Sequence, residues 1–130
     1  MSSTDRNNLG PTQRQLRVAE QVRHILAETM QRGKFNDPVL YEGALNVTVA
    51  EVRMSPDMKH ARAYVMTLGG RNMDTILPAL NNASGMFQKE LAKKLTMKFT
   101  PRVHFVTDET FDEAEKIDNL LRGLPEAPRG

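Results

Sequence analysis

Apolar side chains recur at helical spacing over residues 12 to 32, and this pattern predicts the first helix. Val18, Val22 and Ile25 are three or four positions apart, which places their side chains on one face of an α-helix. Polar and charged residues occupy the other side, as in an amphipathic helix that packs on a core. Gly33 follows the last periodic position and is expected to end the helix.

Alternating apolar and polar positions predict two strands after a loop at Asn36-Asp37-Pro38. The apolar positions of the first strand are Leu45, Val47, Val49, Val52 and Met54. Their alternation shifts by one residue near Ala50 and Glu51, which indicates a β-bulge. Ser55-Pro56-Asp57 has the residue types of a tight turn, and the second strand is expected at about Ala61 to Leu68.

A second helical stripe begins after Asn72 and continues through a segment of small residues, Ala83-Ser84-Gly85. Its apolar positions are Met73, Ile76, Leu77, Leu80, Ala83, Phe87, Leu91 and Leu95. Glycine permits a bend and leaves neighbouring backbone amides accessible, so we expect a helix bent at Gly85 whose amides are open to a phosphate. Pro78 falls in the first two turns, which predicts a late start or an irregular opening turn.

The residues after Pro101 predict the last strand and a short final helix. Val103, Phe105 and Thr107 alternate with other residues, and Thr110-x-x-Glu113 resembles a capping box. A helical crossover joins parallel strands, whereas a hairpin joins antiparallel ones. The sequence therefore predicts an α+β fold, in the order α-β-β-α(kinked)-β plus a short C-terminal helix, with a three-stranded mixed sheet and helices packed on one face.

Composition indicates one globular domain of ordinary type. The chain has 130 residues, of which 39% are hydrophobic and 26% charged, and we expect a flexible arm at residues 1–11, a single domain at 12–122 and a flexible tail at 123–130. Cysteine is absent from the sequence, which suits a reducing compartment. Neither a signal peptide nor a membrane-spanning run is found, so the expected location is the cytoplasm and no membrane partner is expected.

Charge is distributed unevenly along the chain. The net charge is +2, but residues 1 to 106 carry 15 Lys and Arg against 9 Asp and Glu, and residues 107 to 130 carry 3 against 7. This asymmetry suggests a basic body that meets a polyanion and an acidic C-terminal segment. Two solvated faces without any ligand are the alternative interpretation.

Basic residues are concentrated after the expected bend. They are Lys89, Lys93, Lys94, Lys98 and Arg102. We expect them largely to share one side of the domain, interrupted only by Glu90, and to bind nucleic-acid phosphates with strong salt dependence and little base specificity. A solubilising helix face would give a similar pattern.

Catalysis and metal binding have little support in the sequence. His24, His60 and His104 fall in separate elements, and no pair of residues has the spacing of a zinc site or of a nucleophile with its base. Gly69-Gly70 lacks the remaining residues of a phosphate loop and is interpreted as a turn. No enzymatic activity, cofactor, metal or small-molecule substrate is therefore expected.

Three segments in a fixed order carry a family resemblance. They are VRMSPDMKHARAYV at 52 to 65, ALNNASGMFQKELAKKL at 79 to 95 and FTPRVHFVTDETFDEAEKIDNLL at 99 to 121. They contain a Ser-x-Asp turn (Ser55, Asp57), an Ala-x-Gly bend (Ala83, Gly85) and a Pro-x-x-x-Phe-x-x-Asp strand (Pro101, Phe105, Asp108). Over roughly residues 12 to 122 the chain resembles the ribosome-binding factor A family.

The resemblance implies a type II KH-like fold and a bacterial factor that assists small-subunit assembly without enzymatic activity. Its implied partners are the immature 30S ribosomal subunit and 16S rRNA, in the 5′ region and the decoding neck, with a role in cold growth. An ordinary KH domain has a Gly-x-x-Gly loop between two helices, where this chain has Ala83-Ser84-Gly85. A rigid basic face that recognises folded rRNA therefore fits better than clamping of a single strand.

The hypothesis for the site combines the basic residues with the bend. The residues expected to contact rRNA are Arg14, Arg17, Ala83, Ser84, Gly85, Lys89, Lys93, Lys94, Lys98 and Arg102. The alternative is a protein-interaction module that uses the kinked helix and the acidic C-terminal helix. A monomer is expected, because no long exposed apolar stripe requires a dimer.

Overall fold

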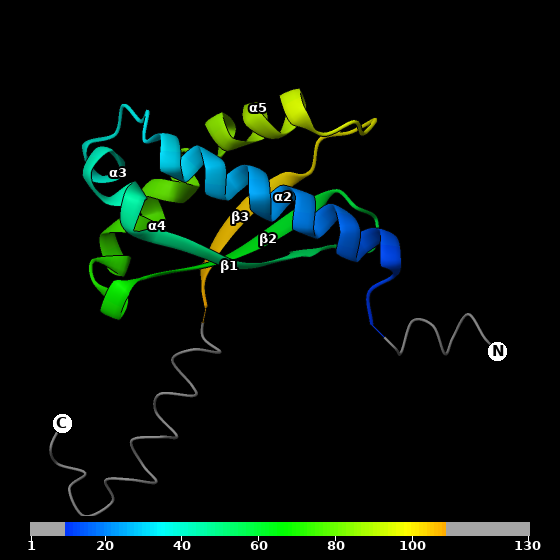
Figure 1. Ribbon diagram of the computed structural model, residues 1–130, viewed down its shortest axis with the longest axis horizontal. Helices are drawn as coiled ribbons and strands as arrows, with labels where there is room; N and C mark the ends of the chain where they lie inside the picture. Colours follow the sequence, from blue (N-terminus) through cyan, green and yellow to red (C-terminus); the bar gives the residue numbers. More distant parts are fainter. Residues whose placement is uncertain (1–9, 109–130) are drawn as a thin grey trace, which may run out of the picture.

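Helices and strands follow the predicted α-β-β-α(kinked)-β order, with one additional short helix after the first (Figure 1). The computed structural model describes residues 10 to 108. The main elements are α2 (Gln13–Arg32), α3 (Pro38–Gly43), β1 (Val47–Met54), β2 (His60–Thr67), α4 (Met73–Asn82), α5 (Ser84–Lys94) and β3 (Arg102–Thr107), with 3-10 turns η1 (Ala44–Asn46) and η2 (Leu68–Gly70). The C-terminal helix expected from Thr110 lies outside the described residues.

The three strands form one mixed sheet in the order β1-β2-β3. β1 and β2 are antiparallel neighbours, and β2 and β3 are parallel. The register between β1 and β2 shifts between Val49 and Glu51, so the β-bulge expected there is confirmed. The predicted sheet topology is also confirmed, since α4 and α5 form the crossover that joins the parallel strands.

The described helices cover one face of the sheet and leave the other face exposed. Along each strand, buried residues alternate with more exposed ones. α2 packs along β1, while α4 and α5 pack on β3. In the core, the ring centroid of Phe87 lies 5.7 Å from that of Phe35 and 4.9 Å from that of Phe105. One layer of helices on one sheet therefore holds the core, as predicted.

Local sequence signals define both ends of α2. The Thr12 hydroxyl accepts a hydrogen bond from the Gln15 amide, and the Gln15 side chain accepts one from the Thr12 amide. This reciprocal capping box satisfies two amides that a helix start leaves unpaired. Gly33 follows the helix in the left-handed conformation, with φ 63°, which costs glycine little. The predicted start and end of the first helix are confirmed.

The segment before β1 differs from the expected loop and strand. The Asp37 carboxylate accepts a hydrogen bond from the Val39 amide and Pro38 is the first residue of α3, so residues 37 and 38 open a short helix. Leu45, which was expected in the first strand, lies in η1 with 56% of its surface exposed. That expectation was wrong because the apolar alternation continued one step beyond the strand itself.

The kinked helix also departs from the expectation in two details. α4 begins at Met73 and contains Pro78, so of the two expected alternatives the late start was wrong. The residue before the helix, Asn72, has a φ of 57° and makes no capping hydrogen bond through its side chain. The helix is interrupted at Ala83, whose φ of −94° and ψ of 12° lie outside the helical range, whereas Gly85 is already within α5. The expected bend is therefore present but is not placed at the glycine. The apolar stripe crosses it, with Leu80 and Phe87 both fully buried.

Candidate nucleic-acid interface

The break between α4 and α5 exposes the start of α5. The Ala83 amide donates to the carbonyl oxygens of Ala79 (3.1 Å) and Leu80 (3.0 Å), and the Ala83 carbonyl accepts from the Met86 amide at 2.9 Å. Gly85 is exposed, and a Cβ atom added there would have no contact within 4 Å. Its φ is not positive. Neither the backbone conformation nor the packing thus requires glycine at residue 85. The absence of a side chain there leaves the surface beside the kink unobstructed.

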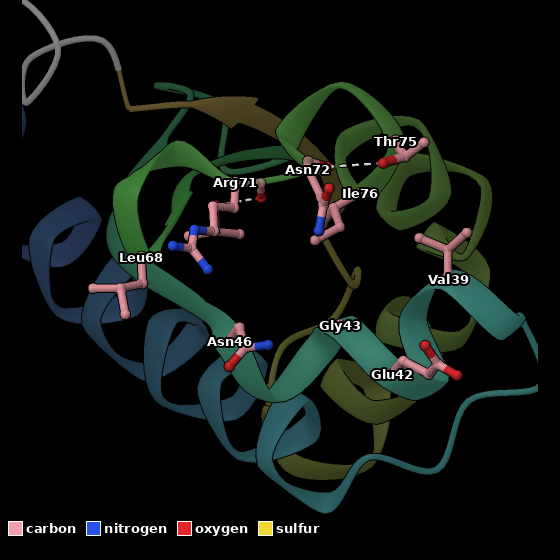
Figure 2. Close-up of a pocket in the computed structure, with 10 residues that line it drawn as sticks. Val39, Glu42, Gly43, Asn46, Leu68, Arg71, Asn72, Thr75 and Ile76 are labelled. Carbon is pink, nitrogen blue, oxygen red and sulfur yellow. Dashed lines mark hydrogen bonds between the residues drawn. The ribbon is translucent and has the colours of Figure 1, made fainter.

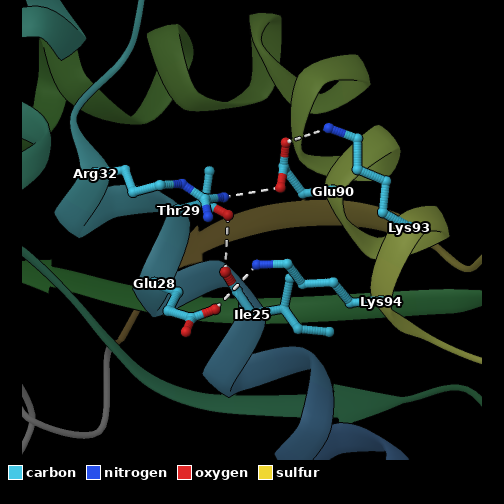
Figure 3. Close-up of polar contacts among 7 residues, drawn as sticks. All are labelled: Ile25, Glu28, Thr29, Arg32, Glu90, Lys93 and Lys94. Atoms are coloured by element: carbon cyan, nitrogen blue, oxygen red, sulfur yellow. Dashed lines mark hydrogen bonds and ion pairs between the residues drawn. The ribbon is translucent and has the colours of Figure 1, made fainter.

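Two carboxylates interrupt the basic residues of α5 (Figure 3). The Lys94 ammonium group lies 3.1 Å from the Glu28 carboxylate of α2. The Glu90 carboxylate lies 2.8 Å from the Arg32 guanidinium and 3.4 Å from the Lys93 ammonium. We call Glu28, Arg32, Glu90, Lys93 and Lys94 the ion-pair cluster. The expectation that Glu90 alone interrupts the basic surface was wrong, because Glu28 reaches it from the other helix.

The surroundings of Glu90 favour its ionised form. The side chain of Glu90 is only 17% exposed, and this burial acts to raise the pKa of its carboxyl group. The hydrogen bond from Lys93 and the charges of Lys93, Arg32 and Lys94 outweigh the burial, so the pKa is lowered below its ordinary value of 4.5. The cluster retains one excess positive charge at neutral pH.

Two of the predicted cations near the kink and α5, Lys89 and Lys98, have no ion pair among residues 10 to 108. Lys89 is exposed, and Lys98 lies over the Phe99 ring with its ammonium 5.7 Å from the ring centroid. The Phe99 side chain is itself 62% exposed. Lys89 and Lys98 are therefore the candidate residues of this region that could bind a phosphate without first leaving a carboxylate.

The remaining predicted cations lie apart from the ion-pair cluster. Arg102 is exposed on β3 while Val103 and Phe105 face the helices, so its side chain is on the opposite face of the sheet from α5. Arg14 precedes Glu28 by 14 residues in α2, about 20 Å along the helix axis. The expectation that the basic residues largely share one side was wrong for Arg102. Arg14 and Arg17 are in the same helix as Glu28 but lie several turns away from the ion-pair cluster.

A separate hollow of about 450 Å³ lies between α3 and the start of α4 (Figure 2). Gly69 and Gly70 beside it have φ values of 68° and 71°, and this left-handed pair confirms the turn predicted there. The Thr67 hydroxyl donates to the Arg71 carbonyl at 2.7 Å, and the Thr75 hydroxyl donates to the Asn72 carbonyl at 3.0 Å. These hydrogen bonds account for the local conformation without a bound phosphate.

Residues 10 to 108 contain no group of three or more potential metal-ligating side chains. Within the same range, no helix has the length and apolar character needed to cross a membrane.

Sequence comparisons agree with the resemblance carried by the three segments. The family model described as Ribosome-binding factor A matches residues 14–121. Ribosome-binding factor A of Methylorubrum extorquens (strain PA1) is 52% identical over 126 residues, covering 92% of this chain and 86% of the relative.

Structures of ribosome-binding factor A from other organisms share the fold. The crystal structure of ribosome-binding factor A from Thermus thermophilus has a TM-score of 0.61 at 28% identity, covering 73% of this chain and 97% of that one. A homology model of the Thermus thermophilus factor, fitted into a cryo-EM map of a 30S complex, has a TM-score of 0.54 at 28% identity, with coverages of 70% and 91%. On the family match and the close relatives, the chain belongs to the ribosome-binding factor A family.

Proposed function

We propose that this chain is a non-catalytic factor of ribosome biogenesis that binds the immature 30S subunit through 16S rRNA and assists its maturation. The observation that carries the proposal is family membership together with a structural relative that was fitted into a 30S complex. The 5′ region of 16S rRNA, the decoding neck and a role in cold adaptation are the finer parts of the same proposal. The factor would act as a monomer in the cytoplasm, where ribosomes assemble.

The kink and α5 are the proposed contact with rRNA. Lys89 and Lys98 have no ion pair within residues 10 to 108, and the surface beside Gly85 is open to a phosphate. Lys93 and Lys94 stay near this surface through their pairs with Glu90 and Glu28. A phosphate that approaches can take over these ammonium groups, because Lys93 and the Glu28 carboxylate are mostly exposed and ion pairs at the surface contribute little free energy. The less exposed Glu90 would keep its pair with Arg32.

Rigid shape is the proposed basis of site selection. The order of elements supports the KH-like class, but Ala83-Ser84-Gly85 does not have the two glycines with which a KH domain clamps nucleotides. Backbone contacts from a fixed surface position a protein without reading bases. A factor that binds one rRNA arrangement more tightly than another shifts the population toward the first. It would dissociate once maturation removes the preferred arrangement.

The test is cosedimentation with immature 30S particles over a salt series. The double variant Lys89→Ala, Lys98→Ala should fold normally but associate more weakly, and its salt dependence should be flatter by about 0.7 to 0.9 log units for each phosphate that is no longer neutralised. The variant Lys93→Ala, Lys94→Ala should give a smaller loss, because these ammonium groups begin in ion pairs. Arg71→Gln, which removes a charge at the distant hollow, serves as the control.

Unchanged association of both double variants would remove α5 from the interface. Limited ribonuclease treatment separates the proposal from the alternative of a protein-interaction module. Loss of cosedimentation after treatment supports contact with rRNA, whereas retention at full strength would favour docking on a ribosomal protein.

A further inference from the structure

The face of the sheet that the helices leave uncovered carries its own group of cations. Side chains directed to this face alternate with the core residues of each strand. The exposed arginines there are Arg53 on β1, Arg62 on β2 and Arg102 on β3, and the half-buried Tyr64 lies among them. We call Arg53, Arg62, Tyr64 and Arg102 the sheet patch.

Strand register brings the three arginines together. Arg53 pairs with Arg62 across β1 and β2, and Arg62 pairs with His104 across β2 and β3. Arg102 lies two residues before His104 on the same face of β3. Neighbouring strands are about 4.8 Å apart and residues on one face of a strand about 6.6 Å apart. The Cα atoms of the three arginines therefore lie within about 12 Å of one another.

Only part of this positive charge is neutralised inside the described chain. Arg53 lies 2.8 Å from the Glu51 carboxylate, and its guanidinium lies 5.3 Å from the centroid of the Tyr64 ring. Arg62 and Arg102 have no ion pair among residues 10 to 108. A hollow of about 270 Å³ covers part of the patch; its lining includes Arg53, Arg62 and Tyr64 but not Arg102. The patch thus combines a concave surface at Arg62 with a second available guanidinium group, that of Arg102, on the neighbouring strand.

The chemistry of the patch fits a polyanion better than a protein surface. Protein interfaces are built around a buried apolar centre, but the large exposed hydrophobic side chains of residues 10 to 108 all lie elsewhere. They are Leu16, Val39, Tyr41, Leu45, Leu68 and Phe99. Guanidinium groups match phosphate oxygens in a bidentate way, and an aromatic ring offers a surface on which a base can stack.

We propose that the sheet patch binds a second segment of RNA, with Arg62 and Arg102 on phosphates and Tyr64 against a base or ribose. This inference rests on the proposed function, since it assumes that the chain meets rRNA. It goes beyond that function because the patch and α5 lie on opposite sides of the sheet. The domain would lie between two RNA segments and hold them at a fixed separation.

The test compares Arg62→Gln, Arg102→Gln and their double variant with Arg71→Gln, which removes the same charge per substitution at an exposed site away from the patch. Binding to immature 30S particles is measured over a salt series. The double variant should weaken association several-fold and flatten the salt slope by about 1.5, because two phosphates are no longer neutralised. Tyr64→Leu should weaken association at all salt concentrations while leaving the slope unchanged.

Arginine modification by phenylglyoxal gives a second readout on the unaltered protein. Arg62 and Arg102 should react in the free protein and be protected on 30S particles, while Arg71 reacts in both. Protection that is already present in the free protein would overturn the inference, because the patch would then not be free for a ligand. Protection that survives ribonuclease treatment would overturn it in favour of a protein partner.

The outcome for α5 separates this inference from the proposed function. If the Lys89 and Lys98 variant loses association while the sheet-patch variants bind like Arg71→Gln, the proposed function stands and the second RNA contact is wrong. If the unaltered protein does not associate with 30S particles, the proposed function is wrong, and the second RNA contact that depends on it is wrong as well.

Discussion

The side-chain amide of Asn81 binds both backbone groups of Phe105. Its Nδ2 atom donates to the Phe105 carbonyl at 3.0 Å, and its Oδ1 atom accepts from the Phe105 amide at 2.8 Å. β3 is at the edge of the sheet, where such groups have no strand to pair with. Asn81 supplies the missing partner from the last turn of α4. The kink that follows at Ala83 is therefore fixed relative to β3.

Replacing Asn81 with alanine should lower the free energy of unfolding by about 1 to 3 kcal/mol. The variant loses two hydrogen bonds and leaves the partly buried amide and carbonyl of Phe105 unpaired, which costs more than the bonds themselves contribute. Urea unfolding followed by circular dichroism measures the change. Asn82→Ala is the matched control, because Asn82 is exposed in the same turn. Equal destabilisation of the two variants would contradict the role of Asn81.

Elements governed by neighbouring residues could be predicted from the sequence. The Ser55 hydroxyl donates to the Asp57 carboxylate at 2.6 Å, and the same carboxylate accepts from the Lys59 amide at 3.0 Å, as turn chemistry requires. The helix start at Asp37 and Pro38 also has a local signal, an N-cap followed by proline. It was missed because the proline was interpreted as a break and not as a first helical residue.

Contacts between distant residues could not be predicted in the same way. Asn81 and Phe105 are 24 positions apart, and Lys94 and Glu28 are 66 apart. No periodicity within one element reveals such a partner, because the pairing depends on how α2, α5 and β3 pack. The position of Arg102 did have a signal, since it alternates with Val103 and Phe105. That alternation places Arg102 on the face away from α5.

The two glycines that border helices should respond differently to alanine. Gly85→Ala should leave the free energy of unfolding unchanged or raise it by less than about 1 kcal/mol, because an added Cβ meets nothing within 4 Å and alanine favours the helix. Gly33→Ala should lower it by about 1 kcal/mol, because Gly33 has a φ of 63°. Thermal and urea unfolding of both variants measure the difference.

Binding of the Gly85→Ala variant tests whether RNA approaches the backbone at the kink. The proposed function predicts weaker association with 30S particles at undiminished stability, because the added methyl group occupies the space a phosphate would use. Ser84→Ala is a companion variant at another expected contact: it removes a hydroxyl group without adding volume, and so separates the loss of a contact from obstruction of the surface. Wild-type association of Gly85→Ala would show that the exposed start of α5 does not contact the ligand.

Glu90 should make the stability of the α2 and α5 contact depend on pH. Its pKa is lowered in the folded protein, so the folded state releases this proton more readily than the unfolded state. The resulting stabilisation is present above the ordinary pKa of 4.5 and is lost as the pH falls through the lower, folded-state pKa. Glu90→Gln should therefore be less stable than the wild type at pH 7, with a difference that shrinks below pH 4.5.

Unfolding free energies of the two proteins at several pH values measure this effect. Other carboxylates with a lowered pKa, such as Glu20 and Asp57, contribute equally to both proteins and cancel in the difference. A constant difference between pH 7 and the acid limit would mean that Glu90 acts by packing and not by charge.

Glu28 offers the opposite kind of test, a substitution that should strengthen binding. Glu28→Gln releases Lys94, and the loss of an ion pair whose carboxylate is 65% exposed should change the free energy of unfolding by less than about 1 kcal/mol. The freed ammonium group should increase association with 30S particles and steepen its salt dependence by up to about 0.9 log units.

The control for this gain is Glu20→Gln, which removes the same charge from the same helix. Glu20 pairs with Arg23 and His24 on α2 itself, eight residues before Glu28 and so about 12 Å away along the axis. Salt-series cosedimentation of the two variants separates a local from a general electrostatic effect. An equal increase in association from both variants would mean that net charge alone draws the protein to the particle. A phosphate contact by Lys94 would then be excluded as the cause.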